Sequence, residues 1–298
     1  MMSIMKNEKK MFKMYVASLI GVCFFVHIIV SRPAYAEDLE LINRPVNTSG
    51  LTGLLFTTAP FTMPPGTIET AASILSENSV TPNYTITEYP ISVTVGMSNN
   101  SELAFRTSYF TITEGPTGTS VITRKAGDLE VAYKWDFLPQ QEATTRPAVA
   151  LIVAGIMPMN NKTDMKINSI VHWGFRAGIA TGSEINWKDH TIGIYADGQI
   201  AGQDLGENRL MDLYRIFNAG IIFPISKYQN LQMFMEYSLV SGKEKLSLSG
   251  GNYNALTYGL RLASERFNLT IGTQFLRKKL EGYDNSGSII GLLSMKFQ

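Results

Sequence analysis

The chain has 298 residues, with 26 Lys and Arg against 25 Asp and Glu, a net charge of +1 at pH 7, and one cysteine. This balance excludes a strongly basic protein of the kind that binds nucleic acid. Beyond residue 36 no apolar run approaches the roughly 20 residues that a membrane-spanning helix needs, which excludes a bundle of such helices.

Residues 1–36 have the order of a secretory signal peptide. Four lysines between positions 6 and 13 precede an apolar stretch over residues 14–30, and Ala34-Tyr35-Ala36 provides a small-residue cleavage site. We therefore predict export and cleavage. The alternative is an uncleaved membrane anchor, because the apolar stretch approaches the length that spans a bilayer. Cleavage would remove five basic residues, one acidic residue and Cys23, leaving 21 basic against 24 acidic residues and a charge of −3.

Residues 37–66 show no alternation in polarity. Prolines at positions 45, 60, 64 and 65 exclude a regular helix or a central strand there. One interpretation is a partly disordered periplasmic arm. The other is a plug folded into the lumen of a barrel, because the stretch is more apolar than a free arm requires. The plug candidates are Leu51, Leu54, Leu55 and Phe56.

From residue 67 to the C-terminus the sequence divides into segments of roughly ten residues that alternate in polarity and are separated by Gly, Asn, Asp, Ser and Pro. Such repetition predicts an all-β fold: a transmembrane antiparallel up-and-down β-barrel of about 12 strands over residues 67–298. The predicted strands are 67–77, 84–97, 102–113, 127–138, 147–158, 168–181, 188–201, 209–224, 229–240, 252–264, 266–278 and 287–298.

Several segments are regular enough to assign faces, because successive side chains of a strand point to opposite sides. In residues 252–264, Leu256, Tyr258, Leu260 and Leu262 alternate with small, polar or charged residues, which predicts an apolar exterior. The inner charges are expected either to fill a narrow interior as ion pairs or to form a polar constriction that sets selectivity. The lumen-lining candidates are Arg106, Glu130, Lys134, Asp136, His172, Arg176, Asp197, Glu236 and Arg261.

Residues 147–158 are apolar on both faces, so part of the interior is expected to be apolar as well. Two explanations remain open. The inner face of this strand packs against residues 51–56, or it forms a path for apolar cargo. Either explanation disfavours a wide aqueous pore.

A soluble β-sandwich also alternates in polarity, but three features favour a membrane barrel. The segments are longer than the five or six residues usual for globular strands. Aromatic residues, among them Trp187, Tyr237 and Tyr253, collect near segment ends, where an interfacial girdle would place them. The last segment alternates up to Phe297, as in C-terminal strands that the barrel-assembly machinery recognises. We expect this machinery and outer-membrane lipid as partners, together with a small solute.

Gly127-Asp128-Leu129-Glu130-Val131-Ala132-Tyr133-Lys134-Trp135, with the apolar segment 147–158 that follows, resembles the paired central strands of a bacterial outer-membrane family. That family is named for the meta-pathway of phenol degradation and is related to fatty-acid and aromatic-hydrocarbon channels. The resemblance covers roughly residues 67–298 and implies transport of small, often hydrophobic compounds. Residues 48–67 resemble instead the mature N-terminus of exopolysaccharide-associated outer-membrane barrels, which implies a different cargo.

Catalysis has little support in the sequence. After cleavage the histidines are His172 and His190, and neither stands in a metal-binding motif such as H-E-x-x-H. We predict no catalytic residue, no metal site and no cofactor. The leading hypothesis is a channel for small solutes in the outer membrane. The alternatives are a non-transporting accessory barrel in envelope or exopolysaccharide assembly and, with least support, an outer-membrane lipid hydrolase.

Overall fold

The computed structural model describes residues 44–79, 84–114, 121–140, 146–159, 173–187, 190–203, 212–225, 230–242, 253–278 and 286–297. The signal-peptide prediction and His172 therefore lie outside the described residues. In these described residues, thirteen strands follow one another. They are β1 Ile68–Ser79, β2 Tyr84–Ser98, β3 Ser101–Glu114, β4 Val121–Ala126, β5 Leu129–Leu138, β6 Ala148–Met157, β7 Gly174–Trp187, β8 His190–Gln203, β9 Asp212–Pro224, β10 Leu231–Gly242, β11 Tyr253–Ala263, β12 Phe267–Lys278 and β13 Ser286–Phe297.

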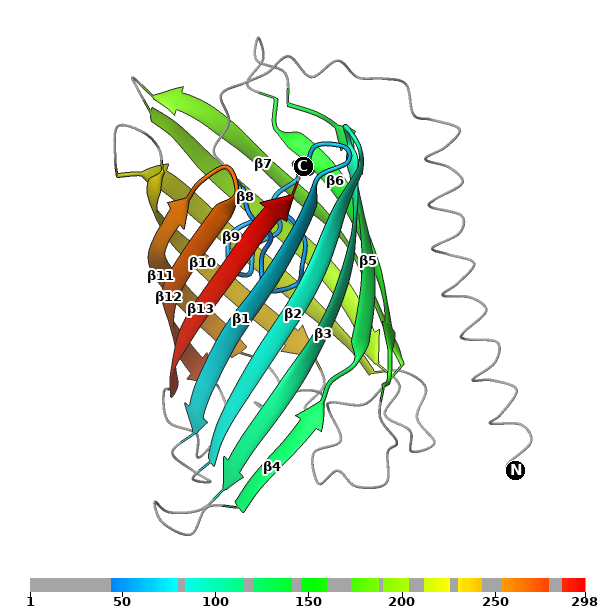
Figure 1. Cartoon of the computed structure of the whole chain (residues 1–298), viewed down its shortest axis with the longest axis vertical. Helices are drawn as coiled ribbons and strands as arrows, with labels where there is room; N and C mark the ends of the chain where they lie inside the picture. Colours follow the sequence, from blue (N-terminus) through cyan, green and yellow to red (C-terminus); the bar gives the residue numbers. More distant parts are fainter. Residues whose placement is uncertain are drawn as a thin grey trace, which may run out of the picture.

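The strands form one closed antiparallel barrel (Figure 1). Consecutive strands pair with each other, except β4 and β5, and the pairing of β1 with β13, from Ile68 opposite Phe297 to Glu77 opposite Ser288, joins the two ends of the sheet. Strands β4 and β5 both pair with β3 and share one place in the ring, so twelve strands surround the lumen. The predicted all-β barrel of about 12 strands is confirmed.

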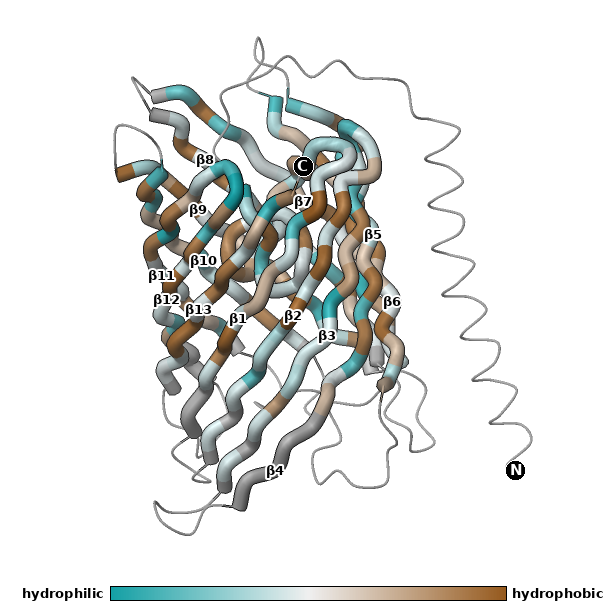
Figure 2. The backbone as a smooth tube through the Cα atoms, viewed as in Figure 1, coloured by the Kyte–Doolittle hydropathy of each residue, from teal (hydrophilic) through white to brown (hydrophobic). Residues whose placement is uncertain are grey.

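The outer face of the barrel is apolar. On β11, Leu256, Tyr258, Leu260 and Leu262 are 43–49% exposed, whereas Ala255, Thr257 and Arg261 on the other face are at most 2% exposed. Figure 2 shows the same alternation of hydrophobic and hydrophilic residues along the strands around the barrel. A surface of exposed Leu, Ile, Met and Phe would be costly in water but is stable among lipid chains. The expected apolar exterior is therefore present on β11.

The two ends of the barrel differ. Strand β1 begins and β13 ends at the same end, which we call the terminal end. The connections there are mostly short and comprise residues 99–100, 139–147, 188–189, 225–230 and 264–266. The connections at the opposite end are mostly longer and comprise residues 80–83, 115–120, 158–173, 204–211, 243–252 and 279–285. Outer-membrane barrels have short periplasmic turns and longer extracellular loops. The terminal end accordingly corresponds to the periplasmic side. No helix in the described part of the chain is long and apolar enough to cross a bilayer.

Residues 44–66, which we call the plug, lie inside the barrel (Figure 1, blue). Leu54, Leu55 and Phe61 of the plug pack with wall residues such as Phe234 and Ile290 in one apolar cluster. Leu51 packs in a second cluster, which is completed by small or aliphatic wall residues: Ala104, Ala132, Ile152, Ala154 and Ala180. The inner face of β6 therefore packs against the plug, as the first of the two explanations requires.

Candidate functional site

The wall of the barrel holds the plug by its backbone. Glu236 on β10 accepts hydrogen bonds from the backbone N–H groups of Leu55, Phe56 and Thr57, at 3.1, 3.0 and 2.7 Å. Asp197 on β8 accepts another from the N–H of Thr58 at 2.8 Å. Buried N–H groups need partners, and these two carboxylates provide them along four successive residues of the plug.

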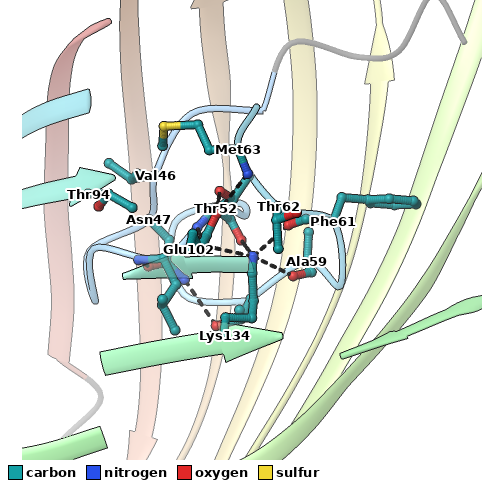
Figure 3. Close-up of polar contacts among 12 residues, drawn as sticks. Val46, Asn47, Thr52, Ala59, Phe61, Thr62, Met63, Thr94, Glu102 and Lys134 are labelled. Atoms are coloured by element: carbon teal, nitrogen blue, oxygen red, sulfur yellow. Dashed lines mark hydrogen bonds and ion pairs between the residues drawn. The ribbon is translucent and has the colours of Figure 1, made fainter. Parts of the chain in front are cut away.

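Lys134 on β5 forms the centre of a second set of contacts (Figure 3). Its ammonium group donates to the carbonyl oxygens of Thr52, Ala59 and Phe61, at 3.3, 3.0 and 2.6 Å. The same group lies 2.9 Å from Glu102, and both side chains are 0% exposed. An ion pair without solvent is stable only when further hydrogen bonds satisfy both charges. Here the carbonyl groups of the plug satisfy the ammonium.

Glu102 on β3 completes this set from the acceptor side. It accepts hydrogen bonds from the backbone N–H and the hydroxyl of Thr52, at 2.8 and 2.5 Å, and from the N–H of Met63 at 3.0 Å. On β11, Arg261 donates to the carbonyl of Gly53 at 3.1 Å, and Glu69 on β1 accepts from the N–H of Val46 at 3.2 Å. The plug is thus held from several sides of the barrel.

The sequence of the plug suits this mode of binding. Short bridges pair Val46 with Thr52 and Gly53 with Thr58, which fold the chain into tight loops that leave other backbone groups for the wall. Gly50 has a φ of 84°, a left-handed conformation that side chains disfavour, and its carbonyl accepts a hydrogen bond from the hydroxyl of Thr94. Turns and irregular loops, rather than a helix, fill the lumen.

Leu54 of the plug packs closely against Gly220 of the wall. A Cβ atom added to Gly220 on β9 would lie 2.5 Å from Leu54 Cδ1 and 3.0 Å from Glu236 Cγ. The missing side chain therefore makes room for Leu54 beside the carboxylate that holds the next plug residues. At the terminal end, Arg44 forms an ion pair with Glu184 and stacks on Phe61, 3.8 Å from the ring centroid.

A row of alternating charges lies on the side of the plug away from the terminal end. Arg106 on β3 pairs with Glu88 on β2 at 2.6 Å and lies 3.9 Å from Glu130 on β5, which also pairs with Arg176 on β7. These four side chains are 10–22% exposed, unlike the fully buried Lys134 and Glu102. Arg106 also donates to the carbonyl of Thr48 at 2.7 Å, so this row touches the plug.

The structure places the candidates from the sequence in two groups. Lys134, Asp197, Glu236 and Arg261 contact the plug, whereas Glu130 and Arg176 belong to the charged row. Arg106 contacts both. Asp136 is buried two residues from Lys134 on the same face. The plug candidates Leu51, Leu54 and Leu55 are buried, and Phe56 is partly buried against the same apolar cluster.

Sequence reasoning missed four acidic residues that face the lumen: Glu69, Glu88, Glu102 and Glu184. Glu69 and Glu102 are each the second residue of a strand, and Glu184 lies near the end of β7. Alternation is read most poorly at strand ends, where few neighbours define a face. Glu69 lies within the predicted segment 67–77, but the faces of that segment were not assigned. Among the described residues, no group of three His, Cys, Asp or Glu could hold a metal ion.

The sequence matches no protein-family profile and no curated protein. The structure, however, is similar to solved outer-membrane barrels. An outer membrane channel from Pseudomonas putida superposes with a TM-score of 0.60 at 10% identity, covering 80% of this chain and 98% of that one. LpxR from Salmonella typhimurium superposes with a TM-score of 0.50 at 11% identity, covering 76% of this chain and 99% of that one. These similarities show that the chain has the fold of outer-membrane β-barrels.

Proposed function

We propose that this protein is a non-enzymatic channel for small solutes in the outer membrane, in which the plug limits the flux. The proposal rests on one observation: the strands that form the wall and the plug that fills the lumen are separate parts of the chain. Strand pairing closes the wall, and the segment that fills the lumen is joined to it through residue 67, which directly precedes β1. A segment that is not part of the wall can move without breaking the barrel.

The polarity of the lumen supports the same proposal. Buried charged and polar side chains face inward on β1, β3, β5, β8, β10 and β11, and many of their partners are plug backbone atoms rather than other wall residues. If the plug left its place, these groups would meet water and line an aqueous path, as polar lumen residues do in open barrels. The structural similarity to a bacterial outer membrane channel is consistent with this role.

Swelling of liposomes in solutions of small solutes tests the proposal. We compare the full chain with a variant that lacks residues 44–62, and we use empty liposomes as the control. The full chain should admit small solutes slowly, and the deletion should admit them much faster, because the wall remains closed while the obstruction is gone. If neither protein makes the liposomes permeable to any solute, polar or apolar, the channel proposal is wrong, and a non-transporting barrel accounts better for the fold.

A further inference from the structure

The charged row beside the plug continues around the lumen into a larger set of polar side chains. Gln199 on β8 lies on the same inner face. Tyr214 on β9 and Arg176 on β7 are both opposite Ala201 of β8 in the strand register, so Tyr214 lies in line with the charged row. We call this set the polar ledge. It comprises Glu88, Arg106, Glu130, Arg176, Gln199 and Tyr214.

The polar ledge lies on the side of the plug away from the terminal end. On β5, Lys134 contacts the plug, and Glu130 lies four residues farther from the terminal end. On β8, Asp197 contacts the plug, and Gln199 lies two residues farther in the same direction. In an outer-membrane barrel this side faces the exterior. A solute that entered from outside would meet the ledge before the plug.

The charged row of the ledge is balanced, and the neighbouring Asp197 carboxylate already accepts hydrogen bonds from Gln199 at 2.6 Å, Asn218 at 3.1 Å and the N–H of Thr58 at 2.8 Å. Arg106 and Arg176 are matched by Glu88 and Glu130 in one alternating row. A net positive row would attract anions and a net negative one cations, but a neutral row selects neither by charge alone. An apolar solute would have to displace water from four charged groups without replacing their hydrogen bonds, which is unfavourable. The chemistry of the ledge therefore favours an uncharged solute that carries hydrogen-bonding groups.

Two atoms of the ledge have unused hydrogen-bonding capacity. Among the described residues, Arg176 Nε and Gln199 Oε1 are buried and have no hydrogen-bond partner, and Gln199 is 5% exposed. The two residues lie on paired strands, Arg176 opposite Ala201 and Gln199 opposite Gly178, so they are diagonal neighbours on one face. The Nε–H is a donor and the amide oxygen an acceptor. A hydroxyl group both donates and accepts, and adjacent hydroxyls would satisfy both atoms.

We propose that the polar ledge binds a small, uncharged, polyhydroxylated solute of the carbohydrate type. This inference rests on the proposed channel function and names the class of solute that the channel receives. Arg106 gives the site a direct link to the plug, because the same guanidinium that forms the row also donates to the carbonyl of Thr48. A bound solute would therefore occupy the place next to the obstruction that it has to pass.

Saturation-transfer NMR on the full chain in detergent micelles tests the proposal, with sucrose, benzoate and toluene as probes. We expect saturable binding of sucrose and weaker or no binding of the other two. Gln199→Leu should weaken sucrose binding about fivefold, the loss expected for one hydrogen bond of about 1 kcal/mol. The matched control is Gln274→Leu, an inward glutamine on β12 whose amide donates to Thr257, and it should change binding less than twofold.

A second variant keeps the test decisive if Gln199→Leu does not fold. Arg176→Lys retains a positive charge beside Glu130 but lacks the Nε–H donor, so it should also weaken sucrose binding about fivefold. Binding of benzoate or toluene without sucrose would overturn the proposal, and so would sucrose binding that both variants leave unchanged. Binding is measured here without transport. If the barrel binds sucrose but is impermeable in liposomes, the proposed channel function is wrong and the proposed binding site is not.

Discussion

Lys134→Met should release the plug from the wall. The substitution leaves the Glu102 carboxylate without its counter-charge where both side chains are 0% exposed, and it removes the donor from the carbonyls of Thr52, Ala59 and Phe61. Loss of one partner of a buried ion pair costs about 3–5 kcal/mol. We therefore expect proteolytic cleavage within residues 44–66 of the folded barrel to become at least about a hundredfold faster, since cleavage follows the population of the released state.

The control is the double variant Glu102→Gln with Lys134→Met. It removes both charges, and the glutamine oxygen can still accept from the N–H of Thr52 or Met63, so most of the protection should return. The heat-modifiable migration of both variants on a gel would verify that the barrel itself is closed. If protease cleaves the plug no faster in Lys134→Met than in the unmodified protein, the Lys134 contacts do not hold the plug.

Glu236→Ala should have the next largest effect, and a local one. Without the carboxylate, the N–H groups of Leu55, Phe56 and Thr57 lose their acceptor, and each buried unpaired donor costs about 1–3 kcal/mol. Hydrogen exchange followed by mass spectrometry should show residues 55–57 exchanging at least about a hundredfold faster, which corresponds to about 3 kcal/mol.

Ser238→Ala provides the matched comparison for Glu236→Ala. Ser238 lies on the same strand and the same inner face as Glu236 and is 4% exposed. Unlike Glu236, it has no carboxylate that could accept hydrogen bonds from the plug backbone. Exchange at residues 55–57 should remain within about threefold of the unmodified protein in this variant, as for most substitutions away from a network. Equal exchange in the two variants would show that the three N–H groups do not depend on Glu236.

The barrel could be predicted from the sequence because strand alternation is a local signal. In β11 and β12 the predicted segments 252–264 and 266–278 agree with the observed strands within two residues. The prediction was less accurate beside long connections. The segment 168–181 begins in the structure at Gly174, and the extension of β5 into β4 was missed, because Gly127 and Asp128 interrupt the alternation between them.

The candidate site was harder to predict, because its partners are far apart in the sequence. Alternation places Glu236 on the inner face, but its hydrogen bonds to residues 55–57 span about 180 positions. The apolar residues Leu51 and Leu54 indicate that residues 37–66 pack against another part of the protein. The apolar inner face of β6 is a surface that such residues can pack against, as Leu51 does. Which backbone group meets which carboxylate depends on the loops of the plug, and no periodicity encodes these.

The central claim is that residues 44–66 fill the lumen of the folded, membrane-inserted barrel. Because Cys23 lies in the predicted signal peptide, single-cysteine variants of the processed chain can be labelled at one site with a membrane-impermeant maleimide. Leu54→Cys, at a position 1% exposed, should react at least about a hundredfold more slowly than Pro65→Cys, which lies in the exposed residues 64–66 at the C-terminal end of the plug. Equal rates at the two positions in the folded protein would contradict the claim.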